Sequence, residues 1–222
     1  ILLLELNSQL GLTNQKIHKA SHVIITLGTA WVYRFVESQN IVANCHKVPQ
    51  KLFSKELLSP EIIAQSIESI LFNISVVNPN CNFVFTVSPV RHLKDGFTEN
   101  TLSKSHLISA LHKTITHHPL PITYFPSYEW QIDVLRDYRY YDTDLVHPNY
   151  AATAYIYDRL VQYAMKPEAV ALLPRLESLV TADAHRSRLP QSPANQAFEE
   201  NRTQQWQELL REFPFLASRR DR

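Results

Sequence analysis

His22-Val-Ile-Ile-Thr-Leu27, followed at once by Gly28, is the stretch that best predicts the fold. Its apolar residues are nearly continuous rather than alternating, which is typical of a strand buried on both faces of a parallel sheet. Gly28 and Thr29 then lie just past the carboxyl end of that strand, where open α/β sheets bind their ligands. Gly28 also has a simpler interpretation, because a glycine after a strand permits a tight turn.

Further elements of the same kind follow along the chain. Residues 81–87 and 121–125 are predicted strands, because each is a short apolar run bounded by turn residues. A helix is predicted from Ser59, where a capping serine, a proline and an acidic residue precede isoleucines at helical spacing. A second helix is predicted over residues 99–117. Strands that alternate with helices indicate an α/β fold with a mostly parallel sheet covered on both faces.

The sequence Asp142-Thr-Asp-Leu-Val-His-Pro-Asn149 places a carboxylate three residues before an imidazole. Asp144 is close enough along the chain to bind one ring nitrogen of His147, which fixes the tautomer and leaves the other nitrogen free to accept a proton. Pro148 suits the first position of a helix, so we expect His147 on the loop that leads into one. The pair is a candidate general base, or alternatively a structural pair that pins this loop to the helix.

Polar residues also follow the second predicted strand, where Ser88, Arg91 and His92 occur within five residues. The carboxyl ends of parallel strands meet at one edge of a sheet. We therefore expect these residues to converge with Gly28 and Thr29 and with the loop of Asp144 and His147. Three polar loops at one edge form a stronger site hypothesis than any one of them.

A nucleophile is harder to find in this sequence. Ser88 is the best internal candidate, because it follows a strand end. It lacks the Gly-x-Ser-x-Gly elbow, and its successor Pro89 has no N–H to serve as the usual oxyanion donor. Thr29 has no visible activating base. The residues alone predict an acid/base pair and a polar rim without a nucleophile.

Composition limits the possible classes of function. The chain has 222 residues, 45% of them hydrophobic, which predicts a packed globular domain. A formal charge of +1 without a cluster of basic and aromatic residues gives no indication of nucleic-acid binding. The apolar runs are too short to span a membrane. Only three glycines are present, which excludes a phosphate loop and a dinucleotide fingerprint, and no cofactor is expected.

No metal site is predicted either. Cys45 and His46 are adjacent, so their side chains would point to opposite faces of an extended segment, and no second ligand pair accompanies them. The chain also lacks the His-Glu-x-x-His spacing of zinc hydrolases. A metal-dependent hydrolase that uses some of the ten histidines is therefore only a third alternative.

The composition changes towards the carboxyl terminus. We expect an α/β domain over residues 1–163 and a helical extension over residues 164–222, with helices at 166–186 and 193–212. At the other end, residues up to about 20 are predicted to be helical with an interruption near Gly11. The chain begins with Ile1 and its only methionine is Met165, which predicts a fragment or a processed chain and leaves its compartment unassigned.

Four motifs together resemble the GSCFA domain family, a branch of the SGNH-hydrolase-like group. They are Thr26-Leu-Gly-Thr-Ala-Trp-Val-Tyr33, Asn44-Cys-His-Lys47, Thr86-Val-Ser-Pro-Val-Arg-His-Leu-Lys-Asp-Gly-Phe97 and Leu135-Arg-Asp-Tyr-Arg-Tyr-Tyr-Asp-Thr-Asp-Leu-Val-His-Pro148. The resemblance implies a flavodoxin-like, three-layer α/β/α fold. The Gly-Ser-Cys-Phe-Ala motif that names the family is absent here, so the resemblance implies a domain that lacks its first segment and its nucleophilic serine.

The resemblance also implies roles for residues of this chain. His147 matches the base of the Asp-x-x-His block of SGNH hydrolases, and Asp144 matches its orienting carboxylate. Gly28 and Thr29 lie where the oxyanion-binding Gly-x-Asn block normally occurs, but the asparagine is missing. The motif of Ser88, Arg91 and His92 is expected to line the rim or bind substrate.

Two classes of function follow from these expectations. The first is a serine-dependent esterase or acyltransferase that acts on a small-molecule or carbohydrate O-acyl ester and is inactive without its nucleophile segment. The second is a non-catalytic binding or assembly domain that retains the SGNH-like fold. The sequence does not predict the oligomeric state.

Overall fold

The computed structural model describes residues 2–42, 44–45 and 47–217. The chain divides into two compact units, residues 1–158 and 159–222. His46, which follows Cys45, lies outside the described residues.

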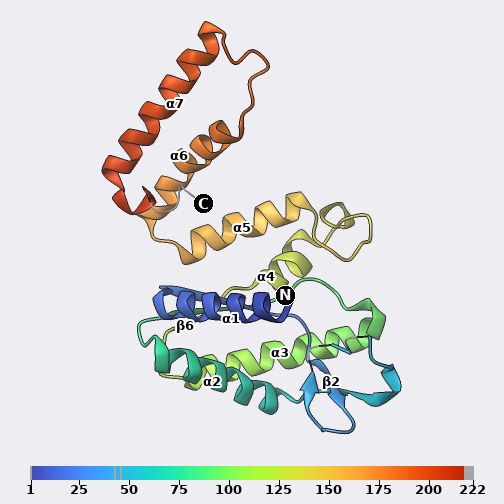
Figure 1. The fold of residues 1–222 in the computed structure, drawn as a ribbon. Helices are drawn as coiled ribbons and strands as arrows, with labels where there is room; N and C mark the ends of the chain where they lie inside the picture. The colour runs from blue at the N-terminus through green and yellow to red at the C-terminus, as the bar shows by residue number, and fades with distance from the viewer. Residues whose placement is uncertain (1, 43, 46, 218–222) are drawn as a thin grey trace. The chain divides into compact units, whose positions relative to one another are not determined.

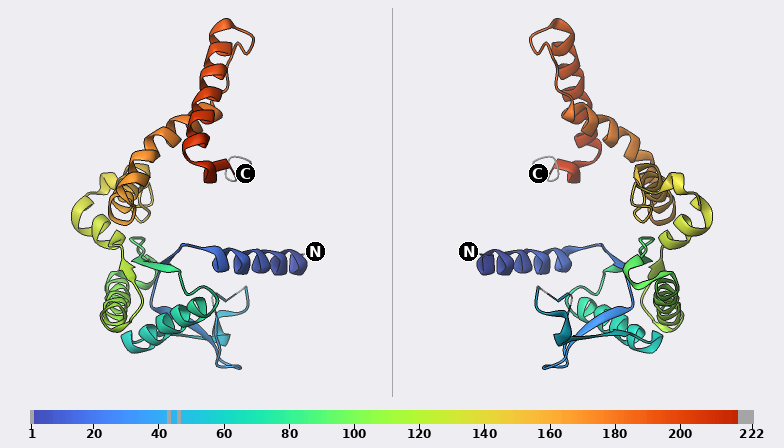
Figure 2. Two further views of the ribbon diagram at one scale, coloured as in Figure 1. Left: turned by 90° about the vertical axis from the view of Figure 1, so that its left-hand side faces the viewer. Right: turned by 90° about the vertical axis from the view of Figure 1, so that its right-hand side faces the viewer.

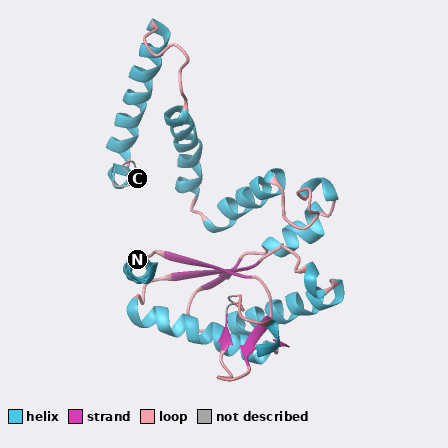
Figure 3. Ribbon diagram, turned by 45° about the vertical axis from the view of Figure 1, so that its right-hand side comes forward, coloured by secondary structure: helices cyan, strands magenta, loops and turns pink. Residues whose placement is uncertain are grey.

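A parallel sheet forms the centre of the first unit (Figures 1 and 3). Its strand order is β1 (His22–Leu27), β5 (Asn82–Val87) and β6 (Ile122–Tyr124), and β1 pairs with β5 from His22 opposite Asn82 to Leu27 opposite Val87. The helices α2 (Pro60–Val77) and α3 (Phe97–His117) connect these strands and pack on one face. The predicted α/β class and three-layer α/β/α architecture are confirmed.

The central strand β5 carries the most deeply buried residues of the sheet. Phe83, Phe85 and Val87 are almost completely buried against α2 and α3. On the opposite face, the hydroxyl of Thr86 lies 2.5 Å from that of Ser127 in the short helix α4 (Ser127–Glu129). The helix α2 begins as predicted, because the Ser59 hydroxyl accepts a hydrogen bond from the N–H of Ile62.

The structure corrects two expectations about the amino-terminal part. The strand β1 is not buried on both faces, because alternate residues are exposed and Ile24 retains 58% of its accessible surface. It is the edge strand, paired only with β5 among the described residues. The helix α1 (Leu2–Lys19) continues through Gly11 without the predicted interruption. None of its residues is buried, and it projects from the sheet (Figure 2).

A second, small sheet follows directly after β1. It consists of β2 (Trp31–Phe35) between β3 (Ile41–Val42) and β4 (Phe53–Leu57), with antiparallel pairing on both sides. Residues that lie opposite each other in antiparallel strands point to the same face. Because β2 begins only four residues after β1 ends, this small sheet stands next to the carboxyl edge of the parallel sheet.

The chain then turns repeatedly before the helix that follows His147. These turns are a π-helical turn η3 (Trp130–Leu135) and a 3₁₀ turn η4 (Tyr138–Tyr140), and the helix that follows is α5 (Tyr150–Ala164). The prediction that Pro148 begins this helix is wrong. Pro148 instead forms an antiparallel bridge with Tyr141, and Asn149 caps the helix through its side-chain oxygen, which accepts from Ala152 N at 3.1 Å.

The second unit contains the helices α6 (Pro167–Ala184) and α7 (Pro193–Glu212) and the short turn η5 (Pro214–Leu216). The two helices share a small core of Leu172, Leu179, Trp206 and Leu209. The indole N–H of Trp206 donates to Asp183 at 3.0 Å across them. In the part of the chain that the structure describes, no helix combines the length and apolarity needed to cross a bilayer.

Candidate functional site

The loop that carries Asp144 and His147 is closed at its base by backbone hydrogen bonds. Asp142 N–H donates to the carbonyl of His147 at 2.8 Å, next to the bridge between Tyr141 and Pro148. Leu145 N–H donates back to the carbonyl of Asp142 at 2.9 Å. These bonds hold residues 142–147 as a compact turn, so the backbone determines the relative positions of the Asp144 and His147 side chains.

Asn149 fixes the same loop from its carboxyl side. Its side-chain N–H₂ donates to the carbonyls of Arg139 and Tyr141, at 2.7 and 3.2 Å, while its own N–H donates to the Tyr140 carbonyl. The same side chain caps α5. Sequence analysis missed this role because the proline at 148 indicated a different start of the helix. An asparagine immediately before a helical pattern was the available signal.

Asp144 uses both of its carboxylate oxygens within the loop. Its Oδ1 accepts hydrogen bonds from the N–H groups of Val146 and His147, each at 2.9 Å. Its Oδ2 lies 2.6 Å from Nδ1 of His147. The backbone N–H of His147, followed by the His147 side chain and the Val146 N–H, lowers the pKa of Asp144 from 3.8 to about 2. The carboxylate is therefore ionised at neutral pH.

This geometry determines what His147 is able to do. A carboxylate on Nδ1 favours the tautomer that carries the proton there, and Nε2 is then an acceptor. Among the described residues, the imidazole hydrogen-bonds only to Asp144. Its side chain is 61% exposed, so Nε2 has access to a ligand or solvent. The pair has the arrangement of a general base and its orienting carboxylate.

Leu145, between these residues, adopts a left-handed backbone conformation with a φ of 58°. This region is unfavourable for a residue with a branched side chain, at a cost of about 1 kcal/mol. The conformation turns the chain so that the Asp144 carboxylate faces the N–H groups of Val146 and His147. The strained residue thus lies in the turn that builds the pair.

The first rim loop, after β1, is held by hydroxyl groups. Ser103 of α3 accepts a hydrogen bond from Ala30 N at 2.7 Å and pairs with the Thr29 hydroxyl at 3.0 Å. The Thr29 hydroxyl in turn accepts from Trp31 N at 3.1 Å. The N–H groups of Ala30 and Trp31 are therefore already used, and neither is free to bind an oxyanion. Gly28 has no positive φ, so its interpretation as a special turn residue is not supported.

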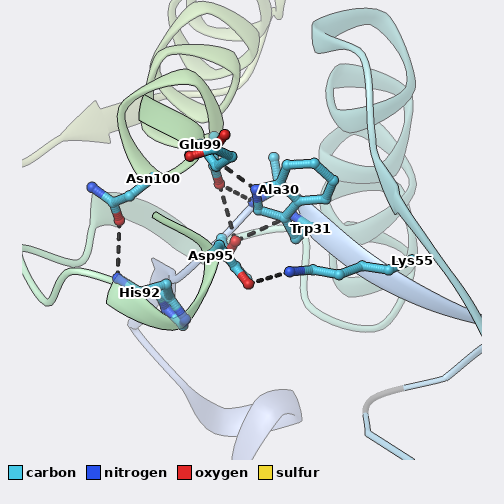
Figure 4. A network of polar contacts seen from close by, with 9 residues as sticks. Ala30, Trp31, Lys55, His92, Asp95, Glu99 and Asn100 are labelled. Carbon is cyan, nitrogen blue, oxygen red and sulfur yellow. Dashed lines mark hydrogen bonds and ion pairs between the residues drawn. The ribbon is translucent and has the colours of Figure 1, made fainter. Parts of the chain in front are cut away.

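The second rim loop, after β5, is attached to the first turns of α3. The N–H of His92 donates to the side-chain oxygen of Asn100 at 3.0 Å (Figure 4). Trp31, which follows the first rim loop, is also attached there, because its indole N–H donates to the carbonyl of Glu99. The Ser88 hydroxyl accepts from Val90 N at 3.2 Å. The guanidinium of Arg91 lies 5.5 Å from the centre of the Tyr141 ring. This last contact brings the loop against the base of the loop that carries His147.

Lys104 joins the two strand ends directly. Its ammonium donates to the carbonyls of Gly28 and Ser88 at 2.6 and 2.7 Å, and the residue is almost completely buried. Burial lowers the pKa of Lys104 to about 8. Sequence analysis did not identify this residue. The signal was a lysine within the apolar stripe of α3, three residues before Leu107 and seven before Leu111.

The structure therefore brings the residues of the two rim loops together, and Asp144 and His147 form a separate pair on their own loop. Gly28 and Ser88 share Lys104, and a β-carbon placed on Gly28 would lie 3.8 Å from Nε2 of His92. Arg91 links this rim to Tyr141. No hydrogen bond joins His147 to Ser88 within the described part of the chain, and Ser88 does not form a nucleophile–base pair in this structure.

The described residues contain no group of three or more histidine, cysteine, aspartate or glutamate side chains arranged to hold a metal ion. Burial, followed by the charge of Lys104, lowers the pKa of His92. His92 is thus favoured as a neutral imidazole at the rim.

Comparison with known proteins identifies a family. The model of the GSCFA family matches residues 2–160, which is more than half of the 222-residue chain. The matched region contains both rim loops and the pair of Asp144 and His147. No curated protein matches the chain. The predicted family resemblance is confirmed.

Proposed function

The chain belongs to the GSCFA family, and on that premise we propose that it supplies the acid/base half of a serine-dependent ester hydrolase or acyltransferase. The observation that carries this proposal is the bond of 2.6 Å between Asp144 Oδ2 and His147 Nδ1, with the other carboxylate oxygen fixed by two backbone N–H groups. This arrangement leaves Nε2 of His147 as the proton acceptor.

In the proposed reaction, Nε2 of His147 takes the proton of a serine hydroxyl as the serine oxygen attacks the acyl carbon. The resulting imidazolium is stabilised by the Asp144 carboxylate. It returns the proton to the alcohol oxygen as the ester C–O bond breaks, which leaves an acyl-serine. A water or a second alcohol then attacks the acyl carbon and gives its proton to His147, and the imidazolium returns that proton to the serine oxygen as the acyl C–O bond to serine breaks.

We assign the nucleophile to a serine that is not among residues 1–222. Ser88 is disfavoured, because its hydroxyl accepts from Val90 N and no bond joins it to His147 in the described residues. Pro89, which follows it, has no N–H for the oxyanion. An O-acyl carbohydrate is the proposed substrate class, by analogy with related esterases.

A fluorophosphonate probe tests this proposal on the full-length protein. The expected result is one serine adduct, located by mass spectrometry outside residues 1–222, that is retained in Ser88→Ala and lost in His147→Ala. His117→Ala is the matched control, because His117 is an exposed histidine at the end of α3. An adduct on Ser88, or labelling that persists in His147→Ala, would contradict the assignment.

A binding or assembly domain is the second candidate. It is favoured by the two backbone hydrogen bonds of Asp144, because they would pin the turn even without any reaction. For such a domain, the folded protein would take up no probe. Its Asp144→Ala variant would lose stability, whereas His147→Ala would change stability little.

A further inference from the structure

A pocket of about 460 Å³ lies beside the rim, between the small sheet and the loop after β5. We propose that it binds a sugar ring that carries one anionic group. The inference rests on the proposed function in one respect, because it makes this ring the non-reacting part of the ester substrate. The residues that carry the argument are Trp31, Tyr33, Val42, Lys55, His92 and Lys94.

One face of the small sheet supplies an apolar wall. Tyr33 lies opposite Val42 in β3 and opposite Lys55 in β4, so these three side chains point to the same face. Trp31 precedes Tyr33 by two residues and therefore shares that face. All of these residues line the pocket. Tyrosine and tryptophan offer large, rigid surfaces, which suit the flat C–H face of a sugar ring.

The charged side chains that line the pocket indicate an anionic ligand. Lys55 forms an ion pair with Asp95, and its ammonium lies 4.8 Å from the centre of the Trp31 ring (Figure 4). The Lys55 charge is therefore balanced within the wall. Lys94 has no ion-pair partner among the described residues, and it lines the same pocket. The pocket thus carries one uncompensated positive charge, that of Lys94, next to the apolar wall.

The position of the pocket connects it to the proposed reaction centre. Thr29 and His92 line the pocket and also belong to the two rim loops. His92 Nε2 faces Gly28, and Arg91, the preceding residue, contacts Tyr141 at the base of the His147 loop. A neutral His92 offers one donor and one acceptor to sugar hydroxyls. A ring in this pocket would lie next to the strand ends, and His147 does not line the pocket.

Calorimetric titration of the whole protein with glucuronate, glucose 6-phosphate and glucose tests the inference. We expect saturable binding of at least one anionic sugar and weaker binding of glucose. If glucuronate binds, the anion is a carboxylate, and if only glucose 6-phosphate binds, it is a phosphate. Lys94→Gln should weaken the anionic sugar about fivefold, as loss of an exposed ion pair predicts. Lys51→Gln, an exposed lysine outside the pocket, is the control.

Tyr33→Leu, which keeps an apolar side chain on the sheet, should weaken all sugars that bind. No saturable binding of any sugar, or equal binding to wild type and Lys94→Gln, would overturn the inference. The titration is repeated with His147→Ala, where binding should be unchanged. Sugar binding without a fluorophosphonate adduct would reject the proposed hydrolase activity and retain the sugar-binding pocket. An adduct without sugar binding would retain the hydrolase activity and reject the sugar-binding pocket.

Discussion

The guanidinium of Arg91 lies over the ring of Tyr141, 5.5 Å from its centre. Arg91 belongs to the loop after β5, and the buried Tyr141 closes the base of the loop that carries Asp144 and His147. This contact links the rim to the base of the loop that carries the acid/base pair. The proposed activity requires the two loops to keep a fixed relative position.

Arg91→Ala should therefore lower turnover while leaving the fold intact. A cation–π contact of this kind contributes about 0.5–1 kcal/mol, so we expect only a small change in the free energy of unfolding. The matched control is Arg139→Ala, because Arg139 lies at the same 5.5 Å from the ring of Tyr140 but away from the rim loop. Urea denaturation and turnover of an ester substrate provide the two readouts. Equal turnover in both variants would argue against the link.

The pKa of Asp144 provides a second prediction. A carboxyl with a folded pKa of about 2, against 3.8 ordinarily, stabilises the loop at any pH above 3.8. That stabilisation is lost as the pH falls from 3.8 towards 2. Carboxyl ¹³C NMR should detect this titration. In His147→Ala the pKa should rise but stay below 3.8, because the backbone N–H groups of residues 146 and 147 remain. A midpoint near 3.8 in the wild type would refute the geometry.

Lys104 predicts a pH dependence of the same sign in an alkaline window. Its pKa is lowered from 10.5 to about 8, so the unfolded chain binds more protons than the folded one between these values. The cost of burying the charged amine is complete below pH 8 and disappears as the pH rises towards 10.5. The free energy of unfolding should therefore increase with pH in this window relative to Lys104→Met. Parallel pH profiles of the two proteins in urea denaturation would contradict the assignment.

The glycines give a paired test of the rim. Gly96 has a φ of +100°, a conformation that is strained for any residue with a β-carbon, so Gly96→Ala should destabilise the fold by about 1–3 kcal/mol. Gly28 does not have this constraint. Gly28→Ala should keep the stability of the wild type but reduce turnover if substrate approaches the strand end. Thermal unfolding distinguishes the two variants, and a large loss of stability in Gly28→Ala would show that its role is structural.

Local sequence signals predicted the elements that depend on local forces. The apolar run of β5 and the Ser59 cap of α2 were sufficient to place both. The burial of β1 was predicted incorrectly, because its exposed face depends on its place at the sheet edge. Likewise, β4 contains Ser54, Lys55 and Glu56 and has no apolar run, so its pairing with β2 determines it.

In the candidate site too, features set by local sequence were predicted and features set by long-range contacts were missed. Asp144 and His147 were found because they are three residues apart and pair through a local turn. Lys104 was missed because its partners, the carbonyls of Gly28 and Ser88, come from strands that are 76 and 16 residues distant in the chain. Only the folded sheet brings those carbonyls to one point.

The central claim is that His147 acts as a general base and not only as a pin for its loop. The most direct measurement is kcat/KM for a 4-nitrophenyl acyl ester, on the full-length protein, in wild type and His147→Ala. Thermal unfolding confirms that both are folded. We expect kcat/KM to fall by about 10²–10⁴ in His147→Ala, the usual contribution of a positioned base. Equal kcat/KM values in two folded proteins would contradict the claim and leave the pair of Asp144 and His147 with a structural role.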